Sequence, residues 1–175
     1  MVILYEIIKM LTFPGALLKG FLEHLFCRLW KVPVEYSDYM QRNELCGHVE
    51  HLLAPHKGSF AICFGPHLIM LLLGSVIAFP GAMNLFYIGT FNWLSVILFY
   101  VGVSFLANAF PLVEDALNMW SELFSDESKG VSKVLLAIPA AIMYVGAYLE
   151  KYCITLLTSL AFAYALPWLV ALIIG

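Results

Sequence analysis

Charged residues are scarce in this sequence. Only 12% of its 175 residues are Asp, Glu, Lys or Arg, whereas a soluble domain carries roughly a quarter. Hydrophobic residues make up 62%, and the mean hydropathy is +0.89. Water is a poor solvent for a surface of this composition. We therefore expect an integral membrane protein that has the lipid bilayer as its main partner.

Other features are missing as well. The formal net charge is −3, so the basic face of a nucleic-acid-binding protein is absent. The four cysteines have no CxxC spacing, which predicts free thiols rather than a disulfide framework. The N-terminal apolar stretch contains Glu6 and Lys9 and lacks a cleavage site, so no removable signal peptide is expected. GxSxG, Walker A and GxGxxG motifs are also absent, and none of these catalytic templates applies.

Four long apolar runs are present, at 60–79, 91–110, 131–149 and 153–174. Each approaches the roughly 20 residues that a helix needs to cross a hydrocarbon core of about 30 Å. Pro80-Gly81 is expected to end the first run. Only Glu150-Lys151-Tyr152 separates the last two, which leaves open a tight hairpin, one long helix or a bent one. Segment 10–30 is expected to be partly embedded, because charged residues interrupt it.

Two segments are more polar. Residues 31–59 form a small insert, in which the alternation around 46–54 is weakly strand-like. Residues 111–130 have the spacing of an amphipathic helix at the membrane surface. The predicted fold class is therefore all-α: a polytopic transmembrane helical bundle of four to five spans over 1–175, with a small polar insert at 31–59. Lys and Arg lie in loops 31–59 and 111–130 but not in 80–90, which predicts that these charged loops are cytoplasmic.

Several short motifs, in order over about residues 11–120, together suggest a family. They are Phe13-Pro14-Gly15, Phe26-Cys27-Arg28-Leu29, Gly47-His48-Val49-Glu50-His51, Gly65-Pro66, Gly102-Val103-Ser104, Ala109-Phe110-Pro111 and Glu114-Asp115-Ala116. This series resembles the small membrane-embedded zincin-like metallopeptidases of the HExxH type. In such a motif two histidines on one helical face bind zinc, and the glutamate between them is the general base.

The chain departs from this family at the catalytic positions. Aligned on Phe-Pro-Gly and Phe-Cys-Arg, the resemblance places Lys19 and Glu23 at the two histidines and Gly20 at the catalytic glutamate. The third ligand position corresponds to Asp115. An ammonium is a poor zinc ligand at neutral pH and glycine cannot transfer a proton. The resemblance thus implies a pseudoenzyme with no catalytic residue and no cofactor.

The leading hypothesis is a non-catalytic membrane subunit or scaffold that works with other membrane subunits in a larger complex. Lys19 and Glu23, spaced i,i+4, can pair on one helical face. One hypothesis is that the Lys19 ammonium, between Glu23 and Asp115, supplies the positive charge that zinc supplies in the family. The plainer alternative is that Lys19 and Glu23 lie on a wet helix face.

Two other functions stay open. The first is an active zinc-dependent membrane metallopeptidase with a shifted metal site, drawn from Glu23, His24, His48, His51 and Asp115. His48 and His51 would share a face in a helix but not in a strand. The second is a small transporter or channel that uses Lys19, Glu23, His67 and Asn108, although His67 is more simply an interior histidine with a hydrogen-bond partner. Gly65, Gly74, Gly102 and Gly146 are expected to permit close helix packing.

Overall fold

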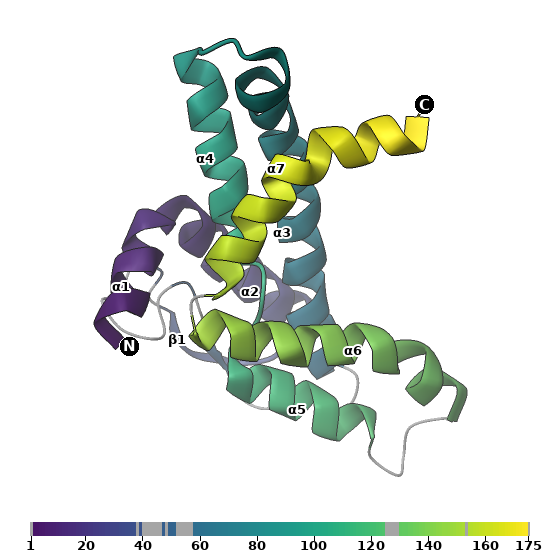
Figure 1. The fold of residues 1–175 in the computed structure, drawn as a ribbon. Helices are drawn as coiled ribbons and strands as arrows, with labels where there is room; N and C mark the ends of the chain where they lie inside the picture. Colours follow the sequence, from purple (N-terminus) through teal and green to yellow (C-terminus); the bar gives the residue numbers. More distant parts are fainter. Residues whose placement is uncertain are drawn as a thin grey trace.

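The structure is a computed structural model that describes residues 2–37, 39, 47, 49–51, 58–124, 130–152 and 154–174 (Figure 1). Its elements are helices α1 (Val2–Leu11) and α2 (Phe13–Leu29), strands β1 (Val34–Ser37) and β2 (Val49–His51), helix α3 (Gly58–Ala82), π-helix η1 (Met83–Ile88), and helices α4 (Trp93–Ala107), α5 (Val113–Leu123), α6 (Gly130–Lys151) and α7 (Ile154–Ile174). The predicted all-α class is confirmed.

The first thirty residues form two helices joined at Thr12. The Thr12 backbone N–H and hydroxyl both donate to the Ile8 carbonyl, each at 2.8 Å. Pro14 then lies in the first turn of α2, where its missing N–H has no cost. The charged residues of this segment are therefore carried by two separate helices.

The polar insert contains a small antiparallel sheet. Val34 of β1 pairs with His51 of β2, and Ser37 pairs with Val49, with an irregularity between Val34 and Tyr36. The strand-like alternation therefore marks a real strand at β2. The fold class accordingly includes a minor β-hairpin beside its helices.

Helix α3 does not end where the sequence predicts. The prediction that Pro80-Gly81 terminates this run is wrong, because the helix continues to Ala82 and then into η1. Proline removes one backbone hydrogen bond, but contacts with a neighbouring helix can compensate in an apolar bundle. Here Gly81 lies directly against α4, where an added Cβ would be 2.6 Å from the Phe99 nitrogen. Gly89, with φ of +74°, ends η1.

Helices α3 and α4 pack closely through small residues. A Cβ on Gly102 of α4 would lie 2.4 Å from the backbone nitrogen of Ala78 in α3. Gly74 likewise faces Leu106 and the Gly102 carbonyl. The predicted packing role is confirmed at both glycines. It is also confirmed at Gly65, which meets the Phe26 ring of α2, whereas Gly146 meets the Phe110 ring in the connection between α4 and α5.

The C-terminal part of the chain folds as two separate helices. Helix α6 packs on α5, and α7 then turns away to lie against α3 and α4 (Figure 1). The contact of α7 joins Ala163 and Leu166 with Ala78, Val103 and Leu106. The alternative of one continuous helix over 131–174 is therefore wrong, because the chain turns at Tyr152.

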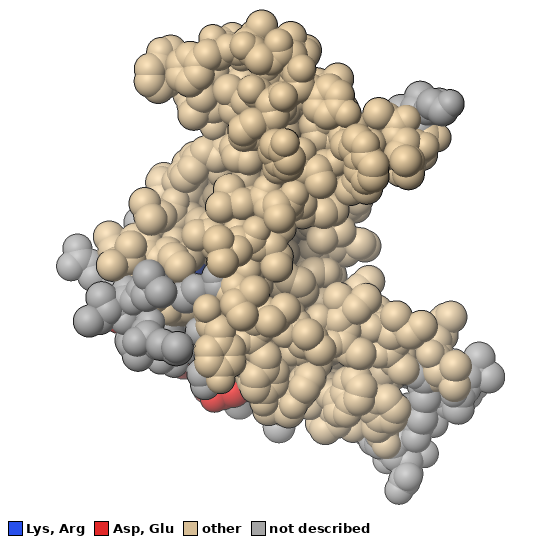
Figure 2. Space-filling view, in the orientation of Figure 1, with Lys and Arg blue, Asp and Glu red and all other residues tan. Residues whose placement is uncertain are grey.

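Two of the described helical segments are long and apolar enough to cross a membrane. They are Phe60–Ile88, with a hydropathy of 2.1, and Ile154–Ile173, with 2.0. Trp93–Ala107 and Val134–Glu150 are shorter apolar helices. Figure 2 shows a face on which nearly all described atoms belong to uncharged residues, with an acidic patch at the lower edge.

Candidate functional site

Two charged residues of α2 point into the protein interior. The Lys19 side chain is only 1% exposed and that of Glu23 is 8% exposed. The Lys19 ammonium donates to the Phe110 carbonyl and lies 3.9 Å from the Glu23 carboxylate. It also lies 3.9 Å from the carboxylate of Glu150, at the end of α6. The alternative that Lys19 and Glu23 lie on a wet helix face is therefore wrong.

A second buried lysine shares the Glu150 carboxylate. Lys9 of α1 is 2.5 Å from Glu150 and donates to the Asn108 side-chain oxygen at 2.9 Å. Its ammonium also lies over the Tyr5 ring, 5.4 Å from the ring centre. We call Lys9, Lys19, Glu23 and Glu150 the buried charge cluster. It joins α1, α2 and α6, and its two positive and two negative side chains balance.

The polar insert closes one side of this cluster. The backbone N–H of Val49 in β2 donates to Glu23 at 3.1 Å. His51, two residues on, lies 3.9 Å from the carboxylate of Asp115 at the start of α5. Asp115 is close enough to Glu23 and Lys19 to interact with both electrostatically. Lys19 therefore pairs with Glu23 and Glu150, whereas the ion pair of Asp115 is with His51, at the rim of the cluster.

Burial shifts the pKa of each of these groups. Burial lowers the pKa of Lys19, and the nearby carboxylates offset this only in part. Burial likewise raises the pKa of Glu23, against the effect of Lys19 and the Val49 N–H. At Lys9 the loss of hydration is outweighed by Glu150 and Tyr5, so the pKa lies above its ordinary value. Lys9 is therefore the firmly charged lysine of the cluster.

At Asp115 burial is again the largest effect. Together with the Glu23 charge it raises the pKa of Asp115 to about 6, against the opposing influence of His51 and Lys19. Because its side chain is 21% exposed, Asp115 can exchange protons with solvent more readily than Glu23.

Gly20 has no room for a longer side chain. A Cβ at this position would lie 2.5 Å from Cδ1 of Tyr39. The Tyr39 hydroxyl in turn is 3.0 Å from Nδ1 of His24. The Tyr39 ring thus covers the position where the resemblance places the catalytic glutamate.

The Phe-Pro-Gly and Gly-x-Ser motifs meet in the structure. The Gly15 backbone N–H donates to the Ser104 hydroxyl at 2.8 Å, and that hydroxyl donates to the Thr12 carbonyl at 2.9 Å. Asn108 donates to the same carbonyl at 3.2 Å and accepts from Lys9. These bonds fix the α1–α2 junction against the end of α4, and the Asn108 side chain positions Lys9.

The residues of the alternative metal site are only partly brought together. His51, Asp115 and Glu23 are neighbours, whereas His24 pairs with Tyr39 and His48 lies outside the described residues. Over the part of the chain that the structure describes, no three His, Cys, Asp or Glu side chains are grouped to hold a metal. His67 contacts the Ala109 carbonyl at 3.2 Å, as expected for an interior histidine.

Two members of the site, Lys9 and Glu150, were not predicted from the sequence. There, Glu150 is part of a polar break between two apolar runs. The position of Glu150 could have indicated a buried ion pair, because a carboxylate flanked on both sides by long apolar runs needs a partner. The same signal applies to Lys9, which lies in an apolar N-terminal stretch, but nothing in the sequence indicates which partner each of the two residues would find.

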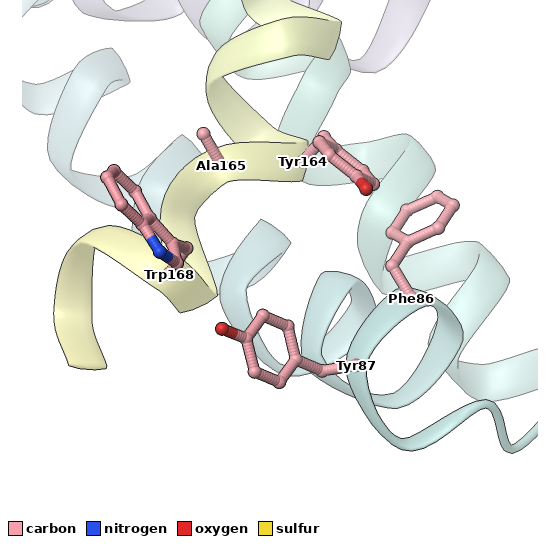
Figure 3. A pocket seen from close by; sticks show the side chains of 5 residues that line it. All are labelled: Phe86, Tyr87, Tyr164, Ala165 and Trp168. Carbon is pink, nitrogen blue, oxygen red and sulfur yellow. The ribbon is translucent and has the colours of Figure 1, made fainter. Parts of the chain in front are cut away.

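A separate pocket of about 320 Å³ opens at the other end of α3, between η1 and α7 (Figure 3). It is lined by Phe86, Tyr87, Tyr164, Ala165 and Trp168. The rings of Phe86 and Tyr164 are 5.1 Å apart and nearly perpendicular. Tyrosine and tryptophan with one apolar side and one polar tip are typical of the membrane–water boundary.

Known proteins offer no guide to this site. The chain matches no family model, no curated protein and no solved structure. The resemblance to the metallopeptidases therefore stays a prediction from its motifs.

Proposed function

We propose that this protein is a non-catalytic integral membrane subunit or scaffold, similar to a degenerate metallopeptidase in which a lysine ammonium stands in place of zinc. One observation supports it most directly. The buried Lys19 ammonium lies 3.9 Å from each of the Glu23 and Glu150 carboxylates, at the position that the resemblance gives to a zinc ligand.

The residues at this position do not fit a zinc ion. An ammonium that donates to the Phe110 carbonyl repels a cation and offers it no lone pair. Gly20 carries no general base, and the Tyr39 ring covers it. The cluster therefore acts as a set of fixed counter-charges that holds α1, α2 and α6 together, and it performs no hydrolysis.

The membrane location rests on the apolar exterior. Val76, Ile97 and Leu157, on α3, α4 and α7, are each more than half exposed. Such side chains suit lipid rather than water. We place α3 with η1, α4 and α7 across the bilayer, which accounts for the predicted spans 60–79, 91–110 and 153–174. The charged segments 31–59 and 111–130 are placed in the cytoplasm.

Metal analysis of rebuilt variants tests the proposal. The wild-type protein, purified without chelators, should contain no stoichiometric zinc. The variant Lys19→His/Glu23→His should gain about one zinc per chain, because two histidines at i and i+4 would then face Asp115. Arg28→His, on the exposed side of the same helix, is the matched control and should gain none. Stoichiometric zinc in the wild type would overturn the proposal.

A shifted zinc site is the second candidate, and the proximity of His51 to Asp115 is the observation that favours it. If it is correct, zinc in the wild type should be lost in His51→Ala and retained in His24→Ala. The transporter hypothesis stays a prediction without a substrate. For a subunit of a larger complex, chemical cross-linking in native membranes should give a heteromeric adduct.

A further inference from the structure

One face of α6 is apolar and lies uncovered. Its residues Val134, Leu135, Ile138, Ile142 and Val145 are between 55% and 76% exposed. At helical spacing they fall on a single side. We call these five residues the α6 stripe.

The opposite face of α6 is fully buried. Ala140 and Met143 pack with Met119 and Leu123 of α5 and with Cys63 of α3. The only charged side chain described on α6, Glu150, belongs to the buried charge cluster. The α6 stripe therefore faces away from α5 and from the protein interior.

Helix α6 crosses the end of α3 instead of running beside it (Figure 1). The two helices share a hydrophobic cluster. The α3 residues in it, Phe60, Cys63 and Phe64, lie within about one turn, whereas the α6 residues extend from Leu136 to Met143. By contrast, α3 and α4 are in contact from Gly74 to Gly81. A helix across the end of a spanning helix lies along the membrane plane.

The depth of α6 agrees with this arrangement. The helical path from Cys63 to Phe86 is about 35 Å at a rise of roughly 1.5 Å per residue. A hydrocarbon core is about 30 Å thick. If the aromatic pocket of Phe86, Tyr87 and Trp168 marks one boundary, α6 lies at the other.

We propose that α6 is an interfacial helix that lies in the bilayer plane and inserts the α6 stripe into the acyl chains of one leaflet. Helix α5, with Glu114 exposed, lies on its aqueous side. This inference rests on the proposed membrane location, and it replaces the expectation that 131–149 spans. Helices with a wide apolar face bind membranes in this way.

Spin labels measure the depth directly. Leu135, Ile138, Ile142 and Val145 are each changed to Cys and labelled with a nitroxide, in a background where Cys46 and Cys153 are Ser. The buried Cys27 and Cys63 stay in place. The protein is placed in vesicles of phosphatidylcholine and phosphatidylglycerol, and collisions with oxygen and with a water-soluble nickel complex are compared. All four labels should report a similar, shallow depth in lipid.

Controls at Leu72 and Val76 in α3 should report greater depth, near the bilayer centre. If depth instead rises and then falls along α6, the helix spans and the inference is overturned. If oxygen and nickel both fail to reach the α6 stripe, another protein or a second copy covers these residues. That result would also overturn the inference. If Leu72 and Val76 are not in lipid either, the proposed membrane location itself fails.

Discussion

Lys19 is the residue on which the site depends. A buried ammonium is costly unless carboxylates and hydrogen-bond acceptors surround it. Lys19 has the Phe110 carbonyl and two carboxylates nearby, and the Val49 N–H satisfies the far oxygen of Glu23. This arrangement explains how the Lys19 ammonium can be buried without unfolding the protein.

Lys19→Met should strongly destabilise the protein, by about 3–5 kcal/mol, because Glu23 would keep a buried charge without its nearest cation. Arg28→Met, exposed on the same helix, should change the free energy of unfolding by less than about 0.5 kcal/mol. Thermal unfolding in detergent, followed by tryptophan fluorescence, measures both. Adding Glu23→Gln to Lys19→Met should restore part of the loss. Equal stability of Lys19→Met and Arg28→Met would contradict a structural role for the charge.

Asp115 should make stability depend on pH. Burial, with the Glu23 charge, raises its pKa from 3.8 to about 6 in the folded state. Between these values the folded protein holds a proton that the unfolded chain has released. Stability from this group is therefore complete below about pH 4 and falls as pH rises to 6, by at most about 3 kcal/mol.

Asp115→Asn keeps the neutral form and should remove this decline. The difference in melting temperature between variant and wild type should be small at pH 4 and favour the variant at pH 7. Glu114→Gln, exposed beside it, is the control and should show no such trend. A pH-independent difference for Asp115→Asn would show that the carboxyl is already ionised in the folded protein at pH 4.

The sequence could predict part of this site and not the rest. Lys19, Glu23 and Asp115 were found because motif spacing places them at related positions. Glu150 and Lys9 were missed because their pairing joins α1 with α6, and local periodicity carries no information on such distant contacts. Gly20 was singled out from the alignment of motifs, and only the structure shows that the Tyr39 ring occupies the adjacent space.

At the scale of the elements, the packing of α3 against α4 requires that the two helix backbones lie close together. Gly102→Ala would place a methyl carbon 2.4 Å from the Ala78 nitrogen, so the helices would have to separate. We expect a loss of about 1–3 kcal/mol, as for other overpacked interiors. Val76→Leu, which adds volume on the exposed side of α3, should cost less than about 0.5 kcal/mol. The melting temperatures of Gly102→Ala and Val76→Leu in detergent test this expectation. Equal melting temperatures for the two variants would argue against close packing at Gly102.

Apolar composition and helical length were enough to locate most helices. The end of α3 was mispredicted because Pro80 is a local signal, whereas the contact of Gly81 with α4 is a tertiary one. The turn at Tyr152 was left open for a similar reason. In the structure the ion pair of Glu150 with Lys9 fixes the end of α6 before α7 begins. The sequence around Tyr152 gives no sign of this pair, because Lys9 lies far away along the chain.

For the whole molecule, the buried charge cluster and the aromatic pocket lie at opposite ends of α3. The buried charge cluster and the polar insert are near its N-terminal end, and the aromatic pocket is at its C-terminal end. Segment 80–90 has no charge, whereas Lys and Arg occur in 31–59. If α3 spans, the positive-inside rule places the insert in the cytoplasm and the aromatic end outside.

Single cysteines on the two sides of α3 test this orientation. In a background with Cys46→Ser and Cys153→Ser, Thr90→Cys should react with a membrane-impermeant maleimide on intact cells. Glu35→Cys should react only after permeabilisation, because one crossing of the bilayer by α3 separates the two positions. Ser121→Cys, exposed on α5, should behave like Glu35→Cys, because α4 returns the chain to the first side. Labelling of all three from outside would show that α3 does not cross, whereas a reversed pattern would keep the spans and invert their orientation.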